Sequence, residues 1–566
     1  MFATGLFARA GAGFPDFWPL TVIVLVALAV RLLAVFSFTG AIDPEGSEYA
    51  RIAENLTAGH GYVGIATPGT QLIFPPLFPF MIAAGSQVTG QAELAGRLVS
   101  VLMGTLLVVV VFFIALNLYD RATAYVAASL IAIHPYLIGF SSTVYGEITY
   151  MTLALAGVYW SVRALREFAR SAFFLAGLFF GLAYLTRPEA ALYPLLALIV
   201  TWTHVFLTDR GAFRRVVWRS LWQPAVFLVL AAPYILWLHG QTGQWRLEGK
   251  TPQNYAASLE VMRGAEVEEA EFGVDSDLTE RGVRITSNLS VLQAADFDAR
   301  DLVNYLRGKA KHVVKYHLDV MKFTAFGSPP LLFFAMYGLF RRPWRRELAA
   351  KQILLLSVLG VSSAALFFAY FLTDRFLLIF VPILVVWAAR GIVELARWAV
   401  STLRLLRGGV SRSARIELGL VLILAMLIPI IAVPGMFHLQ RQSRLGLPLR
   451  TAGEWLKAHA PGPRTVMDGP TLLAFHAAAT FVPFPYSDSD VAIRYLDKRQ
   501  VNFLVLSDYG RETSPRPYLQ AWMDQGVPSA RARLIYDVHQ EGAGRVRIYE
   551  WDLAGRSEKE KPDGHR

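Results

Sequence analysis

Asp43-Pro-Glu45-Gly-Ser-Glu48-Tyr49 follows directly on an apolar stretch, residues 17–38, that is long enough to cross a membrane. Its three carboxylates therefore stand at the exit of a predicted membrane span. Acidic groups beside lipid are unfavourable unless a role offsets the cost of desolvation. The stretch predicts a membrane protein with chemistry at one face of the bilayer.

The composition agrees with that class. Hydrophobic residues make up 54% of the 566 positions, and the mean hydropathy is +0.41. A span needs about 20 apolar residues, and about eleven stretches qualify, several of them broken by Pro, Gly or Arg. The predicted spans are 17–38, 95–118, 122–140, 148–165, 171–186, 188–207, 221–239, 326–341, 352–372, 376–396 and 416–436. We expect a mostly α, polytopic membrane protein. The segment from Pro75 to about residue 90, before the second span, is too short to cross the membrane and is expected to lie at its interface.

The charge pattern indicates topology, not nucleic-acid binding. The net charge is +11, but the Arg and Lys clusters fall in alternate connections between spans, as the positive-inside rule predicts. The clusters are 163–170, 210–219, 341–351 and 390–415. The opposite, outer side then receives the acidic loop, the Tyr145-Gly-Glu147 turn and Arg375. The absence of cysteine is compatible with an oxidising outer compartment.

Two parts of the chain are expected. Residues 1–436 form a membrane domain, with a first outer loop at 39–94 and an outer insert at 240–325. Residues 437–555 read as an outer α/β domain, and the charged tail 556–566 is expected to be disordered. The spacing of apolar residues in the outer domain predicts helices at 449–459 and 489–499 and strands at 465–468, 501–506 and 545–550.

The first outer loop holds the strongest candidates for acid–base chemistry. Glu45 stands four residues before Tyr49, with Asp43 and Glu48 on either side. A carboxylate within hydrogen-bond reach of an acceptor hydroxyl can take its proton. Alternatively, these acids cap a helix that begins near Ser47 or Tyr49, since acids favour helix N-termini.

Other charged residues on the same side leave alternatives open. Glu147 can bind a metal ion or hold a partner, or it can cap the helix that follows. Arg187 can bind phosphate through charge-assisted hydrogen bonds, or it can pair with Glu189 across the break at Pro188. Arg375 can stabilise a departing phosphate or extend to the interface as isolated arginines do.

Three further residues give weaker signals. Arg31, inside the first span, is expected to pair with an acid or reach a lipid headgroup. Lys250 can meet phosphate from the outer insert, although a solvated position is the simpler interpretation. His60, in a Gly-His-Gly-Tyr turn, has no spaced partners of the kind a metal site needs.

The usual nucleotide-binding motifs are missing from the sequence. It contains no P-loop, no dinucleotide-binding glycine fingerprint after a strand and no Gly-x-Ser-x-Gly elbow. A nucleotide-sugar or ATP site therefore has no visible cradle, and a donor substrate is expected to carry its phosphate on a lipid.

The ordered motifs resemble the GT-C superfamily of membrane glycosyltransferases, in particular bacterial proteins similar to dolichyl-phosphate-mannose protein mannosyltransferases and lipid A aminoarabinose transferases. The resemblance covers nearly the whole chain. It rests on Glu45 and Tyr49, Ile52-Ala53, Asn55-Leu56, Gly59-His-Gly-Tyr62, Pro75-Pro76-Leu77, Glu93-Leu-Ala-Gly-Arg97-Leu, Tyr145-x-Glu147, Thr186-Arg-Pro-Glu189, and Arg375-Phe376 before Pro382.

The resemblance implies an inverting transferase that uses a polyprenyl-phosphate sugar in a bacterial inner membrane, with the site on the outer face. A first-loop acid, usually Asp, would activate the acceptor, so Glu45 or Asp43 is the expected base. Glu147 would hold the second loop directly or through a divalent metal. The phosphate would meet Arg187, Arg375 and Lys250. Contacts to the acceptor or sugar are expected from Glu48, Tyr49, His60, Tyr145 and Glu189.

Other functions remain possible on sequence grounds. A polysaccharide polymerase or ligase would keep the acids but use a lipid-linked glycan. A transporter would show charges near the bilayer midplane and two related halves, and no halves are visible. A non-catalytic scaffold would act through its outer domain, and loss of the loop acids would then be silent. The acceptor can be protein, lipid or glycan.

Overall fold

The computed structural model describes residues 17–37, 40–294, 299–322, 329–341, 346–368, 374–402, 446–509 and 516–553. The elements of the N-terminal part are α1 (Trp18–Ser37), α2 (Pro44–Thr57), α3 (Leu77–Thr89), α4 (Ala92–Leu118), α5 (Arg121–Ile133), α6 (Pro135–Ser141), α7 (Gly146–Glu167), α8 (Arg170–Tyr184), η1 (Pro188–Ala191), α9 (Leu192–Thr208), α10 (Arg210–Ser220), α11 (Trp222–Thr242), α12 (Lys250–Met262), α13 (Val267–Phe272), α14 (Asn288–Ala294), α15 (Ala299–Lys322), α16 (Pro329–Phe340), α17 (Arg346–Ala365), η3 (Leu366–Phe368), η4 (Asp374–Leu377) and α18 (Phe380–Thr402). The predicted span 416–436 and tail 556–566 lie outside the described residues.

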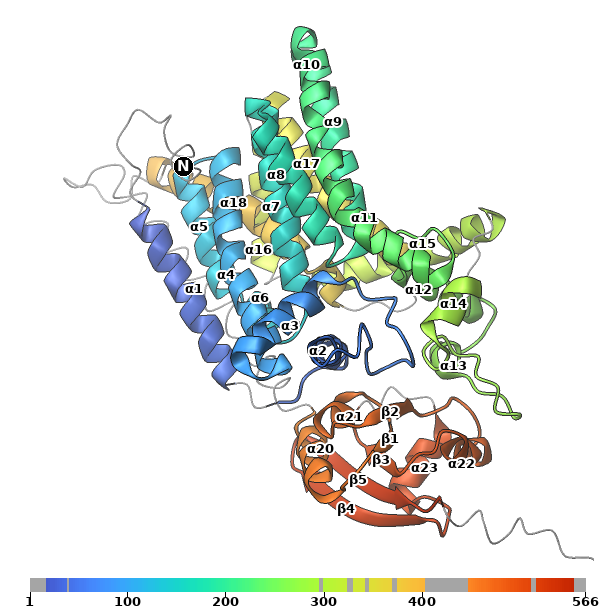
Figure 1. Cartoon of the computed structure of the whole chain (residues 1–566). Helices are drawn as coiled ribbons and strands as arrows, with labels where there is room; N and C mark the ends of the chain where they lie inside the picture. Colours follow the sequence, from blue (N-terminus) through green and yellow to red (C-terminus); the bar gives the residue numbers. More distant parts are fainter. Residues whose placement is uncertain are drawn as a thin grey trace, which may run out of the picture.

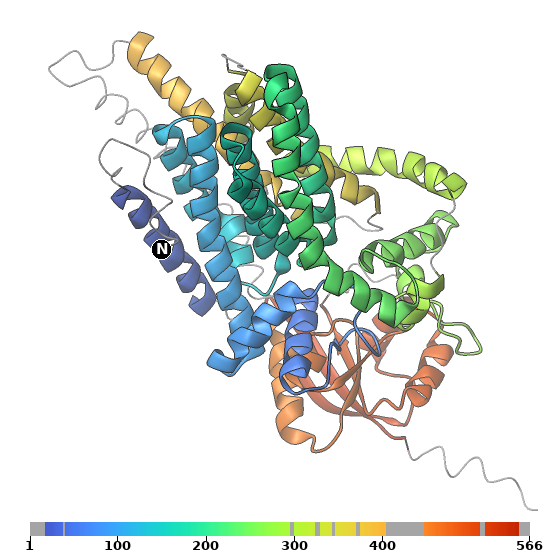
Figure 2. The same cartoon turned by 45° about the horizontal axis from the view of Figure 1, so that its top comes forward.

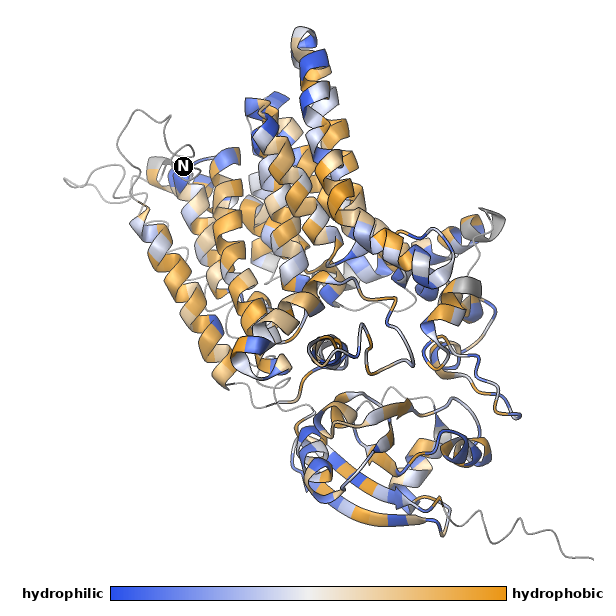
Figure 3. Ribbon diagram, in the orientation of Figure 1, coloured by the Kyte–Doolittle hydropathy of each residue, from blue (hydrophilic) through white to orange (hydrophobic). Residues whose placement is uncertain are grey.

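The apolar helices form one bundle (Figure 1). Helix α4 packs against α1, α5 and α7, α8 packs against α7 and α11, and α18 packs against α16 and α5. Figure 3 shows the bundle as mostly hydrophobic and the part below it as mixed. Five helices in the described ranges are long and apolar enough to cross a membrane, or six when the bent pair α5–α6 counts as one. The chain is thus a multi-pass membrane protein, and the figure of about eleven spans stays a prediction.

A break in the bundle explains the buried Arg31. Helices α5 and α6 meet at Pro135 with a bend of 57°, and a proline has no N–H to bond the carbonyl four residues earlier. Arg31 donates to Ile131 O (3.2 Å) and Ala132 O (3.0 Å), and to Ser141 Oγ (3.2 Å). The expectation that Arg31 pairs with an acid or a headgroup is therefore wrong: it satisfies backbone groups freed at the helix break.

Helix α2 lies at the end of the bundle, outside the apolar layer. It begins at Pro44, three residues before the predicted start near Ser47, because Asp43 is its N-cap and accepts a hydrogen bond from Glu45 N (3.1 Å). It ends at Thr57, just before Gly59, whose φ of 79° is a conformation that glycine adopts without strain. Figure 1 places α2 between the membrane helices and the C-terminal domain, and Figure 2 shows that domain at the same end of the bundle in a second view.

The C-terminal part is a small α/β domain. Its elements are α20 (Leu447–His459), β1 (Thr465–Asp468), α21 (Leu472–His476), β2 (Thr480–Pro483), α22 (Ser489–Lys498), β3 (Phe503–Ser507), α23 (Pro517–Gln525), β4 (Ala532–Gln540) and β5 (Gly544–Trp551). The sheet has the order β2-β1-β3-β5-β4, with β1, β2 and β3 parallel and β5 antiparallel to both neighbours. The predicted helices and the three predicted strands are present, and β2 and β4 are additional.

The outer insert interlocks with this domain. Tyr486 N donates to Phe272 O (2.8 Å), and Val274 N donates to Tyr486 O (3.2 Å). Val274 and Ile285 are buried in the apolar core of the sheet domain. The insert and the C-terminal domain therefore share a core and form one layer at the end of the helix bundle.

Candidate active site

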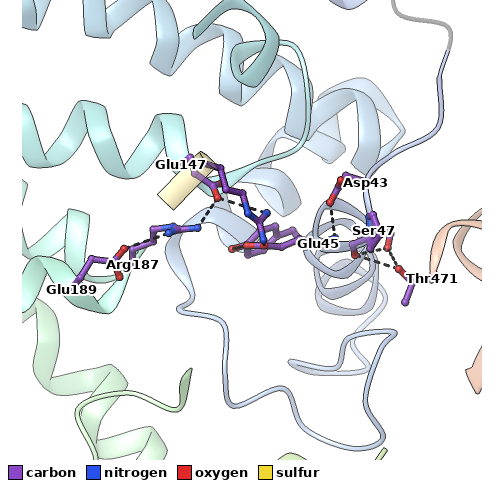
Figure 4. Close-up of polar contacts among 10 residues, drawn as sticks. Asp43, Glu45, Ser47, Glu147, Arg187, Glu189 and Thr471 are labelled. Atoms are coloured by element: carbon purple, nitrogen blue, oxygen red, sulfur yellow. Dashed lines mark hydrogen bonds and ion pairs between the residues drawn. The ribbon is translucent and has the colours of Figure 1, made fainter. Parts of the chain in front are cut away.

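Four segments converge at the end of the bundle that faces the C-terminal domain, and Figure 4 labels the charged side chains Glu45, Glu147 and Arg187 from three of them. They are the first turn of α2, the first turn of α7, the turn before η1, and η4. Each carries a charged residue singled out in the sequence: Glu45, Glu147, Arg187 and Arg375. The prediction that these residues share one side of the membrane agrees with their placement in the structure.

Close packing of the backbone brings α2 and α7 together. A Cβ on Gly46 would stand 2.8 Å from Val144 O, a distance that forces something to move. Glycine at position 46 lets α2 approach the segment that leads into α7. This contact sets the separation between Glu45 and Glu147.

The charged residues form an alternating chain of acids and bases. Arg375 Nη2 lies 2.6 Å from Glu45 Oε2, and its Nη1 lies 3.7 Å from Glu147 Oε1. Arg187 Nη2 lies 2.6 Å from Glu147 Oε1, and its Nη1 lies 3.3 Å from Glu189 Oε1. The Arg187–Glu189 pair predicted as an alternative is thus present, next to a more buried pair that links Arg187 to Glu147.

Both oxygens of Glu45 are engaged. Tyr49 donates its hydroxyl hydrogen to Glu45 Oε1 (3.0 Å), while Arg375 holds Oε2. Burial alone would raise the pKa of Glu45, but Arg375, Lys250 and Arg187 hold it down to about 2. Burial and the charge of Glu45 raise the pKa of Tyr49 well above its usual value, so Tyr49 remains a donor.

Asp43 has a different environment. Its carboxylate caps α2, and its side chain is also hydrogen-bonded to Tyr145. Burial raises the pKa of Asp43, against the opposing effect of Tyr145 and Arg375. The capping role considered for the loop acids therefore applies to Asp43, whereas Glu45 points to the arginines.

Glu147 lies between two guanidinium groups. It is 3% exposed, and Arg187 is 7% exposed. In the described part of the chain, no group of three His, Asp or Glu side chains is arranged as metal ligands would be. A cation bound at Glu147 would be repelled by Arg187 and Arg375, so the arrangement favours direct pairing of Glu147 with arginine.

The site retains unused hydrogen-bonding capacity. Among the described residues, the Nε atoms of Arg187 and Arg375 and Oε2 of Glu147 are buried without a hydrogen-bond partner. Buried donors without partners are unfavourable, and a bound anion would satisfy them. Aromatic rings flank both cations: Arg375 Cζ lies 5.2 Å from the Tyr145 ring centroid, and Arg187 Cζ lies 6.0 Å from that of Phe376.

Lys250 reaches the same site from the outer insert. Its Nζ lies 5.9 Å from the centroid of the Phe74 ring. Burial lowers the pKa of Lys250, and the charge of Glu45 acts in the opposite direction. Lys250 is half-buried and lies close enough to the acids for the charges of Glu45 and Glu189 to act on it, so it is not a fully solvated lysine.

Two candidates lie elsewhere. Glu48 is 1% exposed and turns into the first loop, where it accepts hydrogen bonds from Ile65 N and Ala66 N (both 2.8 Å) and from Gln71. His60 is exposed in the turn after α2. Neither side chain belongs to the alternating chain of acids and bases.

Sequence reasoning missed the contacts of α2 with the C-terminal domain. Ser47 is fully buried against Thr471, which lies between β1 and α21. No local pattern marks this pair, because 424 residues separate its members. The same holds for the rings of Tyr145 and Phe376. Both residues belong to motifs seen in the sequence, but their contacts with the arginines depend on the tertiary fold.

Comparison with solved structures defines the class of fold. ArnT from Cupriavidus metallidurans bound to undecaprenyl phosphate is 14% identical, with a TM-score of 0.56 over 94% of this chain and 98% of that chain. The Archaeoglobus fulgidus oligosaccharyltransferase tethered with an acceptor peptide is 14% identical, with a TM-score of 0.55 over 96% of this chain and 74% of that chain. The archaeal oligosaccharyltransferase AglB from Archaeoglobus fulgidus, in complex with an inhibitory peptide and a dolichol-phosphate, is 13% identical, with a TM-score of 0.54 over 95% of this chain and 74% of that chain.

The chain therefore has the GT-C fold of membrane glycosyltransferases, as the motifs indicated. More narrowly, residues 74–237 match the family model described as dolichyl-phosphate-mannose-protein mannosyltransferase. No curated protein sequence matches the chain.

Proposed function

We propose that the protein transfers a sugar from a polyprenyl-phosphate donor to an acceptor hydroxyl, with inversion, on the outer face of a bacterial inner membrane. The observation that carries the proposal is the placement of Glu45 directly beside Arg375, with Arg187 and Lys250 around it. A carboxylate base next to a cluster of cations suits a reaction in which a proton is taken up and a phosphate departs.

The groups have separate roles in this reaction. The acceptor oxygen attacks the anomeric carbon from the face opposite the phosphate, and the hydroxyl proton passes to Glu45. The bond between the anomeric carbon and the phosphate oxygen breaks, and the phosphate leaves with the electron pair. Arg375, Arg187 and Lys250 neutralise the charge that develops on it. Glu147 keeps the two guanidinium groups oriented.

Lipid phosphates in two relatives support a lipid-linked donor. ArnT has been solved with undecaprenyl phosphate and AglB with a dolichol-phosphate. The buried Nε donors of Arg187 and Arg375 match the need of such a phosphate for hydrogen bonds. Tyr49 and Tyr145, whose hydroxyl groups contact the two loop acids, are the side chains we expect near the sugar or acceptor.

The first test is mass spectrometry of lipids that co-purify with the detergent-extracted protein, comparing wild type with Glu45→Gln. A polyprenyl-phosphate sugar enriched in the variant would support the proposal and identify the sugar. A long lipid-linked glycan would favour a polymerase or ligase. Only bulk phospholipid in both samples, with no transfer by wild type, would count against an enzyme and favour a scaffold.

A further inference from the structure

The C-terminal domain contacts the first turn of α2 through a small polar cluster. The Oγ of Ser47 lies 2.6 Å from Thr471 Oγ1, and both hydroxyl groups lie within hydrogen-bond distance of Pro44 O, at 2.8 and 3.2 Å respectively. Figure 4 shows Ser47 and Thr471 beside Asp43 and Glu45. Two hydroxyl hydrogens thus link three oxygens. We refer to Pro44, Ser47 and Thr471 as the clasp.

The clasp is buried and lies next to the base. Ser47 is 0% exposed and Thr471 is 5% exposed, so water cannot readily replace either partner. The carbonyl of Pro44 belongs to the peptide whose N–H is that of Glu45. Any shift of Pro44 therefore moves Glu45 relative to Arg375 and Tyr49, which hold its two oxygens.

Neighbouring contacts dock the same segment against the C-terminal domain. Ala41 and Ile65 are buried in the apolar core that contains α20, α21 and one face of the sheet. Arg51 Nη2 donates to Phe475 O (3.4 Å). These contacts bind the domain to the first outer loop, and among the hydrogen bonds of the described residues it is those of the clasp that reach the first turn of α2 from the C-terminal domain.

We propose that Thr471 of the C-terminal domain is a positioning residue for Glu45, so that the domain completes the active site of the membrane bundle. The inference rests on the proposed transferase function. Thr471 does not touch the reacting atoms: it acts through Pro44 O and Ser47. Effective catalysis depends on such placement, since a displacement of about 1 Å can lower a rate about 100-fold.

The activity test compares Thr471→Val, Thr471→Ser and Thr480→Val. Valine keeps the shape of threonine but removes the hydroxyl group, serine keeps the hydroxyl group, and Thr480 is an exposed control in β2 of the same domain. For Thr471→Val we expect kcat to fall between about tenfold and 100-fold, with little change in the donor KM or the thermal midpoint. Thr471→Ser should restore kcat, and Thr480→Val should match wild type.

The pH profile separates positioning from simple docking. When Glu45 loses its alignment with Arg375 in the free enzyme, the pKa of Glu45 rises toward its usual value, so the acidic limb of kcat/KM should move to higher pH in Thr471→Val. If wild type is active and Thr471→Val matches Thr480→Val in kcat and pH profile, the inference is wrong and the proposed function stands.

A second measurement does not depend on activity. The chain has no cysteine, so a Ser47→Cys/Thr471→Cys double variant can form only one intramolecular disulfide. The short contact between the native hydroxyl groups suits the Cβ separation of about 3.5–4.5 Å that a disulfide needs. Cross-linking in membranes is expected for this pair and not for Ser47→Cys/Thr480→Cys. Failure of the first pair to cross-link under oxidant would overturn the clasp. An inactive wild type would instead overturn the proposed function, and with it the catalytic role of Thr471.

Discussion

Arg375 and Glu45 form a direct ion pair, with Nη2 of the arginine 2.6 Å from Oε2 of the carboxylate. The proposed base, Glu45, and a proposed phosphate-binding residue, Arg375, are therefore paired with each other in the structure. A donor phosphate that binds Arg375 competes with Glu45, and Glu45 becomes a better base as that pairing weakens. The pair thus links binding of the donor to activation of the acceptor.

Glu45→Gln is expected to lower turnover at least about 100-fold, because a general base typically contributes that much or more. Donor affinity should be retained or increased, since Gln competes less strongly for Arg375. Turnover and donor binding can be measured on the same detergent-solubilised sample. Glu54→Gln is the matched control: Glu54 lies on α2, and its side chain is 46% exposed. Turnover retained in Glu45→Gln would move the base to Asp43.

Arg375→Ala is expected to weaken donor binding tenfold or more, because charge-assisted hydrogen bonds contribute about 1.5–3 kcal/mol. The measurement is the Kd for a short-chain polyprenyl-phosphate sugar. Arg163→Ala is the control, since Arg163 pairs with Glu167 at the far end of α7. Unchanged donor affinity in Arg375→Ala would remove this residue from the phosphate site.

The depressed pKa of Glu45 predicts a pH-dependent difference in stability. Burial opposes ionisation, but Arg375 and the other cations lower the pKa from 4.5 to about 2. The stabilisation is complete above the unfolded pKa and is lost as the pH falls toward about 2. The gap in thermal midpoint between wild type and Glu45→Gln should therefore be constant above about pH 5.5 and shrink below about pH 4.5. If the difference in thermal midpoint stays the same down to pH 3, the Glu45–Arg375 pair does not lower the pKa of Glu45 as described.

The sequence predicted what depends on local pattern. Apolar runs placed the long helices, and their alternation with basic clusters put Glu45, Glu147 and Arg375 on one side. Beyond the local Arg187–Glu189 pair, it could not predict that Arg375 pairs with Glu45 and Arg187 with Glu147, because these pairs depend on the turn before η1 and on the close approach at Gly46. Strand β2 is only four residues long, and β4 is largely exposed, so neither has a clear apolar alternation.

Arg31 and Glu48 show why the partners of single residues could not be predicted. A buried arginine in a span reads as a partner for an acid, yet it satisfies carbonyl oxygens freed by Pro135. Glu48 reads as a third acid of the site, but its side chain folds back into its own loop. In both cases most of the partners are backbone groups, which every sequence supplies and no motif marks.

Glu48→Ala provides a test of that structural role. The change leaves the N–H groups of Ile65 and Ala66 without their acceptor, at a cost of about 1–3 kcal/mol for each buried group. Hydrogen exchange at these two amides should accelerate at least about tenfold, in keeping with that cost. Glu54→Ala, on the exposed face of α2, should leave exchange unchanged. Because Glu48 holds the loop and does not touch the charged chain, the donor Kd of Glu48→Ala should change far less than that of Arg375→Ala. Unaltered hydrogen exchange together with a higher KM for the acceptor would instead support the substrate-binding role that the position of Glu48 in the sequence suggested.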